Sequence, residues 1–270
     1  MSFILLSACG GGSSGDGDDG GAIPVTLSTF QAAETVIGQA DFAGELDNQG
    51  GAPGANTLAF PVGAPSEGSL YLADQDNHRI LGFNAIPTTN NASADFVIGQ
   101  ADFVSNTSGT GANSFIFPGH TVTANGKLFV LDNDNRRVLI WNSLPTSNVP
   151  ADVVVGAPDF TTPGSGATSQ TTISFPGGMA VAGGHLFVSD QGSSRVLIWN
   201  NIPTGNNAPA DVVLGQVNFT DSASGLTDSN LRGPTGVWSD GVRVAVADSI
   251  NNRDRHNELI ELAATKIKFL

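Results

Sequence analysis

Four aspartates and four arginines recur along the chain at a fixed spacing, and they are the first candidates for chemistry. The aspartates are Asp74, Asp132, Asp190 and Asp248, and the arginines are Arg79, Arg137, Arg195 and Arg253, each 58 residues after the last. An aspartate that ends a strand accepts hydrogen bonds from the turn that follows it. An arginine five positions later can form a planar, charge-assisted contact with that carboxylate. The pattern therefore predicts a structural role in four repeated turns.

Other side chains that could bind a metal ion do not share this order. The four histidines, His78, His120, His185 and His256, fall at four different places in the repeat, whereas a zinc site requires several converging ligands. The turns that start at Asp74 and Asp132 begin like a calcium loop but lack its glycine at position six and its glutamate at position twelve. No metal ligand, cofactor-binding residue or catalytic residue is predicted, and no cofactor is expected.

Composition narrows the class of partner. The chain has 270 residues and a formal net charge of −14, with 11 basic and 25 acidic residues. It has no basic stripe that could neutralise phosphates, so nucleic-acid binding is disfavoured. A single cysteine excludes an internal disulfide.

Each repeated unit predicts four short strands. The first strand follows a proline, two more form a hairpin around the Asp-to-Arg turn, and the fourth begins at an alanine. These prolines are Pro61, Pro118, Pro176 and Pro234, and the alanines are Ala94, Ala151 and Ala210. Both faces of Val138–Trp141 are apolar, which indicates strands that are covered on both sides. Such units predict an all-β propeller of four-stranded blades; a solenoid of stacked hairpins is the alternative.

The residues Asp74, Asn77, His78, Arg79, Ile80 and Phe83 together resemble the signature of NHL repeats, which form β-propellers that commonly have six blades. The whole unit is similar to those of bacterial secreted NHL-repeat lipoproteins. The resemblance covers about residues 35–253. It implies a propeller fold, and it implies less about activity, because NHL propellers include binding platforms, sensor domains and a few enzymes.

The first residues resemble a lipoprotein signal. Residues 1–9 end in Leu6-Ser7-Ala8-Cys9. This stretch is similar to the lipobox of bacterial lipoproteins, whose cysteine carries the lipid. Residues 10–23 are rich in Gly, Ser and Asp and read as a flexible tether. The resemblance implies lipidation at Cys9 and a location at the bacterial cell envelope, anchored in the outer membrane or secreted. Any membrane association is expected through this lipid alone.

The repeats, assigned to residues 24–253, stop abruptly in the fourth unit. After Arg253 the tail 254–270 departs from the pattern, and a frameshift or truncation relative to a six-bladed ring is the simplest explanation. A poor third strand at residues 258–262 and a native amphipathic ending are alternatives. Thr35–Gln39 reads as a spare fourth strand that could be lent to the last blade, which would close a four-bladed ring.

Three hypotheses for function follow. The favoured one is a non-catalytic binding or interaction module of the cell envelope, whose polar loops at 106–114, 161–172 and 220–230 would crowd one rim and recognise an envelope protein, a peptide or a glycan. The second is a metal-dependent hydrolase or lactonase of propeller type. The third is a truncated product without function.

Overall fold

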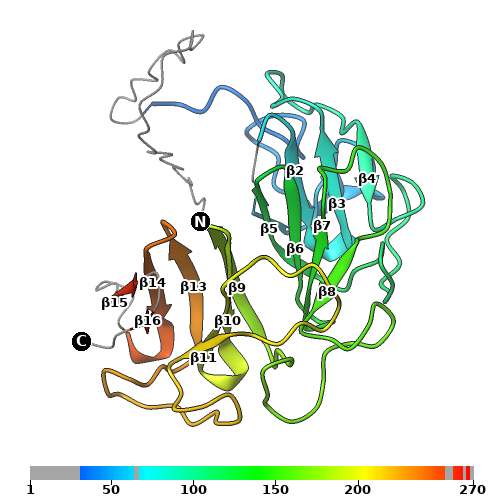
Figure 1. The fold of residues 1–270 in the computed structure, drawn as a ribbon. Coiled ribbons are helices and arrows are strands. Elements are labelled where there is room, and N and C mark those ends of the chain that lie inside the picture. The colour runs from blue at the N-terminus through cyan, green and yellow to red at the C-terminus, as the bar shows by residue number, and fades with distance from the viewer. Residues whose placement is uncertain (1–30, 64–66, 253–257, 264–265, 268–270) are drawn as a thin grey trace, which may run out of the picture. The chain divides into compact units, whose positions relative to one another are not determined.

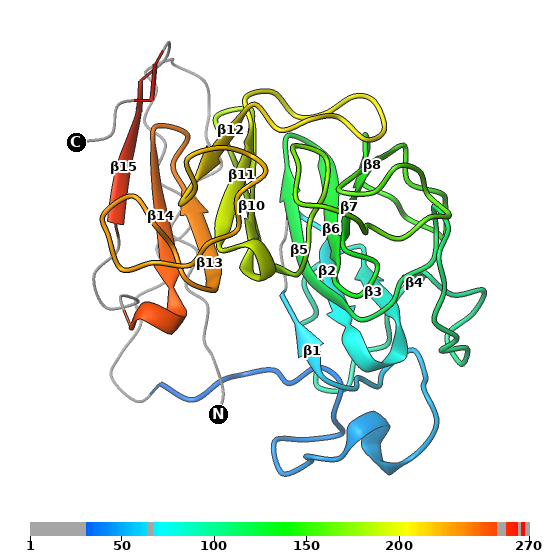
Figure 2. The same ribbon diagram turned by 90° about the horizontal axis from the view of Figure 1, so that it is seen from below.

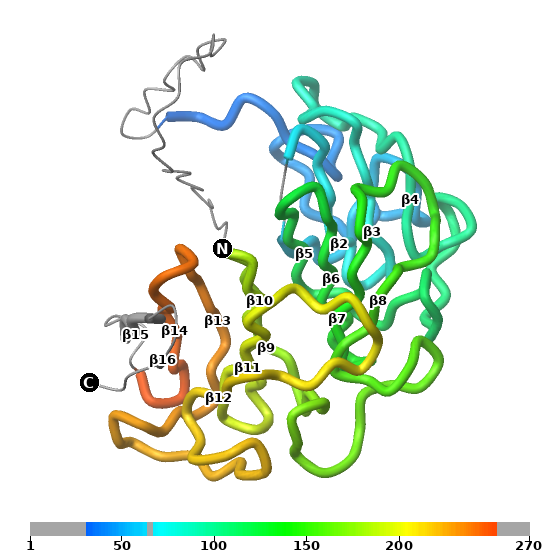
Figure 3. The backbone as a smooth tube through the Cα atoms, in the orientation of Figure 1, coloured from blue at the N-terminus to red at the C-terminus, as the bar shows by residue number. Residues whose placement is uncertain are grey.

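The computed structural model describes residues 31–63, 67–252, 258–263 and 266–267, the last two ranges as backbone only. The chain divides into two units, Met1–Glu34 and Thr35–Leu270, and the second contains every described strand. Its described strands form four antiparallel sheets of four strands each (Figure 1). Each sheet contains one repeated unit, and Figure 3 follows the chain from one sheet to the next.

The first two sheets, here called blades 1 and 2, hold the first two complete units. Blade 1 comprises β1 (Pro61–Val62), β2 (Leu70–Asp74), β3 (Arg79–Phe83) and β4 (Phe96–Ile98). Blade 2 comprises β5 (Pro118–Ala124), β6 (Lys127–Asp132), β7 (Arg137–Trp141) and β8 (Val153–Val155).

Blades 3 and 4 repeat this order. Blade 3 comprises β9 (Pro176–Ala182), β10 (His185–Asp190), β11 (Arg195–Trp199) and β12 (Val212–Leu214). Blade 4 comprises β13 (Pro234–Ser239), β14 (Arg243–Asp248), β15 (Glu258–Ala263) and β16 (Lys266–Ile267). Four short 3-10 helices complete the described elements: η1 (Asp47–Gly50), η2 (Gln75–Asn77), η3 (Gln191–Ser193) and η4 (Ser249–Asn251). None of the described helices has the length and apolar character needed to cross a membrane.

The hairpin of each blade sets its register. Asp74 pairs with Arg79 across the end of the β2–β3 hairpin, and the same pairing joins Asp132 to Arg137 and Asp190 to Arg195. The proline of the first strand pairs with the same aspartate, as Pro61 does with Asp74. The turn, the aspartate and the start of the innermost strand therefore meet at one end of every blade, here called the turn end.

Apolar side chains fill the space between neighbouring blades. Leu128, Val130 and Trp141 of blade 2 pack against Tyr71 and its neighbours in blade 1. Equivalent clusters lie between blades 2 and 3 and between blades 3 and 4. Both faces of the hairpin strands in blades 2 and 3 are thus buried, because successive residues along each strand face alternate junctions, as Val138 and Ile140 face blade 3 while Leu139 and Trp141 face blade 1. The predicted all-β propeller of four-stranded blades is confirmed.

The four sheets do not close into a ring: in the described part of the chain, contacts run from blade 1 to 2, 2 to 3 and 3 to 4 (Figure 2). The prediction that Thr35–Gln39 lends a strand to the last blade is wrong. This stretch forms no strand. It lies against blade 1, because Ile37 packs on that blade and Asn90 Oδ1 accepts a hydrogen bond from Val36 N at 3.0 Å.

Blade 4 completes its sheet from the divergent tail. The backbone of β15 pairs with β14, with Glu258 opposite Val246, and β16 pairs with β15. The third strand, β15, thus covers residues 258–262, the stretch that the sequence offers as a poor third strand. A frameshift or truncation stays a prediction.

Candidate functional site

The repeated aspartates and arginines meet in buried pairs. Arg79 Nε lies 2.7 Å from Asp74 Oδ2, Arg137 Nε 2.8 Å from Asp132 Oδ2, and Arg195 Nε 3.0 Å from Asp190 Oδ2, with every one of these side chains fully buried. The other carboxylate oxygen of each aspartate accepts from the loop before the blade, as Asp74 Oδ1 does from Ala59 N at 2.7 Å. Each carboxylate therefore joins its turn to the preceding loop.

Each arginine adds contacts to the same preceding loop and joins it to the loop that follows the fourth strand. Arg79 Nη2 donates to Gly54 O at 2.9 Å and to Thr57 O at 3.1 Å, while its Nη1 donates to Phe103 O. Arg137 and Arg195 form the corresponding contacts in blades 2 and 3. A buried guanidinium that binds one carboxylate and several carbonyl oxygens uses most of its five N–H donors, so we propose that these residues act as structural ties.

Burial perturbs the carboxylates as well. Burial raises the pKa of Asp132 to about 6, while Arg137, Ile116 N and Asn135 act in the opposite direction. Burial likewise raises the pKa of Asp74. A buried acid with a shifted pKa is a candidate for catalysis. Both oxygens of Asp132, however, already accept hydrogen bonds from Ile116, Asn135 and Arg137, which leaves the carboxylate committed to the fold.

Two predicted site residues lie outside the described residues: Arg253, the partner expected for Asp248, and Cys9, the expected lipidation site. Asp248 itself is buried and follows the pattern of the other three aspartates. It accepts hydrogen bonds from Arg232 N at 2.7 Å and from Asn251 Nδ2 at 2.8 Å.

The described histidines are kept apart by the fold. His78 lies in the turn of blade 1, His120 in the first strand of blade 2, and His185 at the start of β10. Among the described residues, no three His, Cys, Asp or Glu side chains gather in a group that could hold a metal ion. In the turn that resembles a calcium loop, Asp74 is completely buried whereas Asp76 is exposed, so the two carboxylates do not face the same space.

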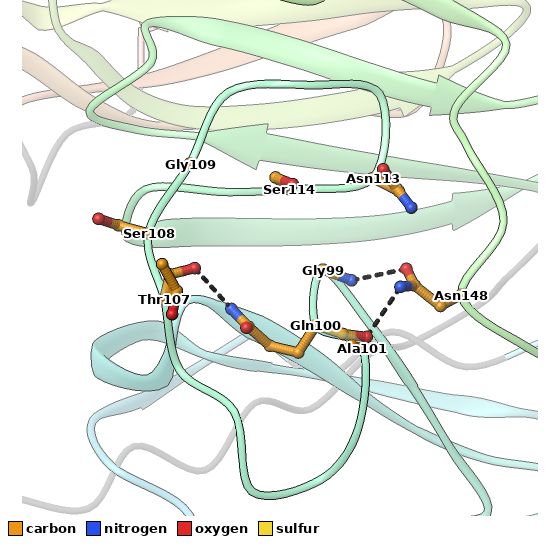
Figure 4. Close-up of a pocket in the computed structure, with 9 residues that line it drawn as sticks. All are labelled: Gly99, Gln100, Ala101, Thr107, Ser108, Gly109, Asn113, Ser114 and Asn148. Atoms are coloured by element: carbon orange, nitrogen blue, oxygen red, sulfur yellow. Dashed lines mark hydrogen bonds between the residues drawn. The ribbon is translucent and has the colours of Figure 1, made fainter.

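A small pocket of about 310 Å³ lies between the loop that follows β4 and the loop that follows β7 (Figure 4). It is lined by uncharged residues: Gly99, Gln100, Ala101, Thr107, Ser108, Gly109, Asn113, Ser114 and Asn148. On one side of the pocket, the Gln100 side chain is fixed by hydrogen bonds: its Nε2 donates to His78 O at 3.0 Å and to Thr107 O at 2.9 Å. Asn148 joins the two loops: Asn148 Oδ1 accepts from Gly99 N at 3.1 Å, and Asn148 Nδ2 donates to Gln100 O at 2.8 Å.

This pocket occurs where one repeat differs from the others. Blades 1 and 3 carry two consecutive asparagines in the loop before the fourth strand, and in blade 3 Asn206 Oδ1 accepts from Val154 N while Asn207 N donates to Val154 O. In blade 2 the second asparagine is missing, and Val149 follows Asn148. Asn148 binds Gly99 and Gln100 instead, which lie just after the fourth strand of blade 1.

The sequence held a signal for this difference. The alanines before the fourth strands, Ala94, Ala151 and Ala210, are 57 and 59 residues apart, while the aspartates of the turns keep their step of 58. The loop of blade 2 is thus one residue shorter than that of blade 1 and that of blade 3. The change in spacing indicates an irregular junction, although it does not specify a pocket.

No protein-family model matches the chain, and no curated protein matches it. Among solved structures, the WD40 propeller domain of Doa1 aligns at a TM-score of 0.45 with 7% identity, over 78% of this chain and 54% of that one. A streptogramin B lyase aligns at 0.41 with 12% identity, over 77% and 53%, and a protein from Lactobacillus plantarum at 0.43 with 12% identity, over 78% and 60%. The chain therefore spans about half the length of the first two of these structures. By the four stacked, four-stranded blades described above, its own fold is a β-propeller.

Proposed function

We propose that the protein is a non-catalytic binding module of the cell envelope, built on an NHL-type propeller and anchored through a lipid on Cys9. The observation that carries the binding function is the pocket at the junction of blades 1 and 2. Its lining offers hydroxyl and amide groups and no charged side chain. Such a lining suits a ligand with uncharged hydrogen-bonding groups, such as a glycan or a peptide backbone.

The repeated charged residues support the same proposal. The carboxylates of Asp74, Asp132 and Asp190 are bound to arginines and backbone amides within the fold. They are therefore not available as a general base or as a set of metal ligands at a shared site.

Arrays of immobilised glycans and peptides, probed with the full chain, test the binding function. Asn113→Ala and Ser108→Ala change side chains that line the pocket, and Ser229→Ala changes an exposed side chain in the loop before blade 4 as a control. We expect the arrays to identify a ligand whose Kd rises about tenfold in each pocket variant. A rise of this size corresponds to the loss of roughly one hydrogen bond. Equal binding by all variants, or an esterase or lactonase turnover that a chelator abolishes, would overturn the proposal.

The envelope anchor has its own test. Metabolic labelling with a fatty-acid analogue is expected to mark the protein and to fail with Cys9→Ala. Absence of label on a protein with an intact leader would contradict the lipid anchor, and it would leave the proposed binding function unaffected.

A further inference from the structure

An apolar side chain is exposed at the turn end of every blade. Phe60, Phe117 and Phe175 each precede the first residue of an innermost strand, and they are 64%, 36% and 49% exposed. All three lie at the turn end, because the proline after each pairs with the aspartate of the hairpin. Neighbouring innermost strands lie side by side in register, as Gly177 of blade 3 does against Pro234 of blade 4. The three phenylalanines therefore share the turn end of the propeller, which the short helices η3 and η4 mark at the bottom of Figure 1.

Blade 4 keeps this feature with different residues. Gly233 takes the place of the phenylalanine, but Ile250 in the adjacent turn is 51% exposed. A Cβ atom added to Gly233 would lie 2.4 Å from Ile250 Cδ1, so the isoleucine occupies the space into which a side chain at 233 would extend. Two changes thus cancel, and an apolar group stays exposed at the turn end of blade 4.

The backbone at this position is unfavourable for phenylalanine. Phe60 and Phe117 have φ angles of 52° and 50°, and Gly233 has 59°. This left-handed region is rare for bulky residues and unrestricted for glycine. Folding alone would favour glycine at positions 60 and 117, as blade 4 has at 233. Strained residues that persist with exposed side chains often belong to binding sites.

Acidic groups flank the two strained phenylalanines. The ring of Phe117 packs edge-on against His78, with ring centroids 4.6 Å apart, and Phe117 N donates to His78 Nδ1 at 3.1 Å. Asp76 and Asp134 are exposed in the turns of blades 1 and 2. Asp76 N donates to Ala59 O and Asp134 N donates to Ile116 O, each at 3.2 Å, which places the two acids beside Phe60 and Phe117. Arg136 is the basic residue in the second turn. The surface between these blades thus combines aromatic rings with two carboxylates and one guanidinium, so acidic groups outnumber basic ones there.

We propose that the turn end of blades 1 and 2 binds an extended peptide segment that carries both apolar and basic side chains. Phe60 and Phe117 contact its apolar side chains, and Asp76 and Asp134 bind a Lys or Arg side chain between them. Contact with an aromatic face and a carboxylate together stabilises such a cation. This inference rests on the proposed binding function, but it uses none of the residues that line the pocket, so either can fail alone.

Fluorescence anisotropy of three labelled octapeptides with the full chain tests this inference: alternating Leu-Lys, alternating Ser-Lys and alternating Leu-Glu. We expect the Leu-Lys peptide to bind at least about tenfold more tightly than either of the others, since it alone has both features. Phe60→Gly and Phe117→Gly are expected to reduce its affinity to that of Ser-Lys. Asp76→Asn and Asp134→Asn are expected to reduce both its affinity and its dependence on salt.

Two controls separate binding from folding. The melting temperature of Phe60→Gly should equal or exceed that of the unaltered protein, because glycine relieves the positive φ angle. Ile86→Gly removes a side chain that is 61% exposed in the loop at the opposite end of blade 1, and it should leave peptide affinity unchanged.

Three results would overturn the inference: unchanged affinity in both phenylalanine variants, equal binding of the Leu-Glu peptide, or no binding of any peptide. Sedimentation of the unaltered protein provides a further check. Self-association that Phe60→Gly and Phe117→Gly abolish would assign the surface to a second copy of the chain instead. The pocket-binding assay is unaffected by all of these outcomes.

Discussion

The carboxylate of Asp190 shows what a single residue contributes to this fold. Its Oδ1 accepts from Ser174 N at 2.9 Å and Phe175 N at 3.1 Å, and its Oδ2 accepts from Arg195. Asp190→Ala leaves the buried Nε of Arg195 and two partly buried backbone donors without this acceptor. We expect a loss of roughly 1–3 kcal/mol in the free energy of unfolding, measured by urea denaturation. Asp228→Ala, which removes an exposed acid, should be neutral; an unchanged midpoint for Asp190→Ala would contradict the structural role.

His78 predicts a dependence of stability on pH. Burial lowers its pKa below the usual 6.5, against the opposing effect of Asp76 and Asp134. Because the folded-state pKa is the lower one, the stabilisation is present above about pH 6.5 and is lost as the pH falls through the folded-state pKa. Protonation of Nδ1 would also remove the acceptor for Phe117 N.

The variant His78→Asn isolates this effect. His78 has a φ of 52°, a conformation that asparagine tolerates well. Between about pH 7.5 and about pH 5, melting curves of the variant should show a smaller loss of stability than those of the unaltered protein. Identical slopes for the two proteins would assign the acid sensitivity to other groups.

At the scale of the strand pair, blade 1 differs from blades 2 and 3 in one pair of packed residues between its third and fourth strands. Gly82 of β3 faces Phe96 of β4, whereas the same position pairs Ile140 with Val153 in blade 2 and Ile198 with Val212 in blade 3. A Cβ atom at Gly82 would lie 2.0 Å from the Phe96 ring. The ring therefore fills the space that an isoleucine side chain fills elsewhere.

A double-mutant cycle tests this exchange of volume. Gly82→Ile should destabilise the protein by about 1–3 kcal/mol through overpacking. Phe96→Val should cost less than the roughly 3–5 kcal/mol of a Phe→Ala change. The double variant restores the blade 2 pair, so we expect a coupling energy of at least about 0.5–1 kcal/mol from denaturant unfolding. Additive losses would show that the two residues do not share this space.

The sequence predicted the elements that the repeats have in common and missed what depends on their differences. Trp141 and Trp199 are buried between blades as the pattern predicts, because equivalent residues in equivalent strands meet equivalent neighbours. The pocket at Asn148 lies where one loop is a residue shorter, and Phe60 is exposed at a position with a positive φ angle. Neither follows from composition or period, since an aromatic residue before a strand reads as part of the core.

At the scale of the whole propeller, residues 35–58 act as a cover for blade 1. They occupy the position that the fourth strand and loop of a preceding unit would take, and Ile37 and Leu58 pack on Leu70, Leu72 and Phe83. Without this cover the face of blade 1 that points away from blade 2 would be apolar and open, and soluble monomers rarely expose apolar patches of more than a few hundred Å².

Two deletions separate the cover from the segment before it. Removal of residues 1–30 leaves the cover intact and should preserve the melting temperature of the protein and its elution without aggregates. Removal of residues 1–58 should expose Leu70, Leu72 and Phe83, which we expect to appear as binding of a hydrophobic dye and as aggregation on size-exclusion chromatography. Since each blade is stabilised mainly by contacts with its neighbours, loss of the cover should destabilise blade 1 first, and hydrogen exchange should rise in β2 and β3 before β10 and β11. Uniform exchange across blades 1 and 3 in the shorter protein would mean that the cover contributes nothing specific to blade 1.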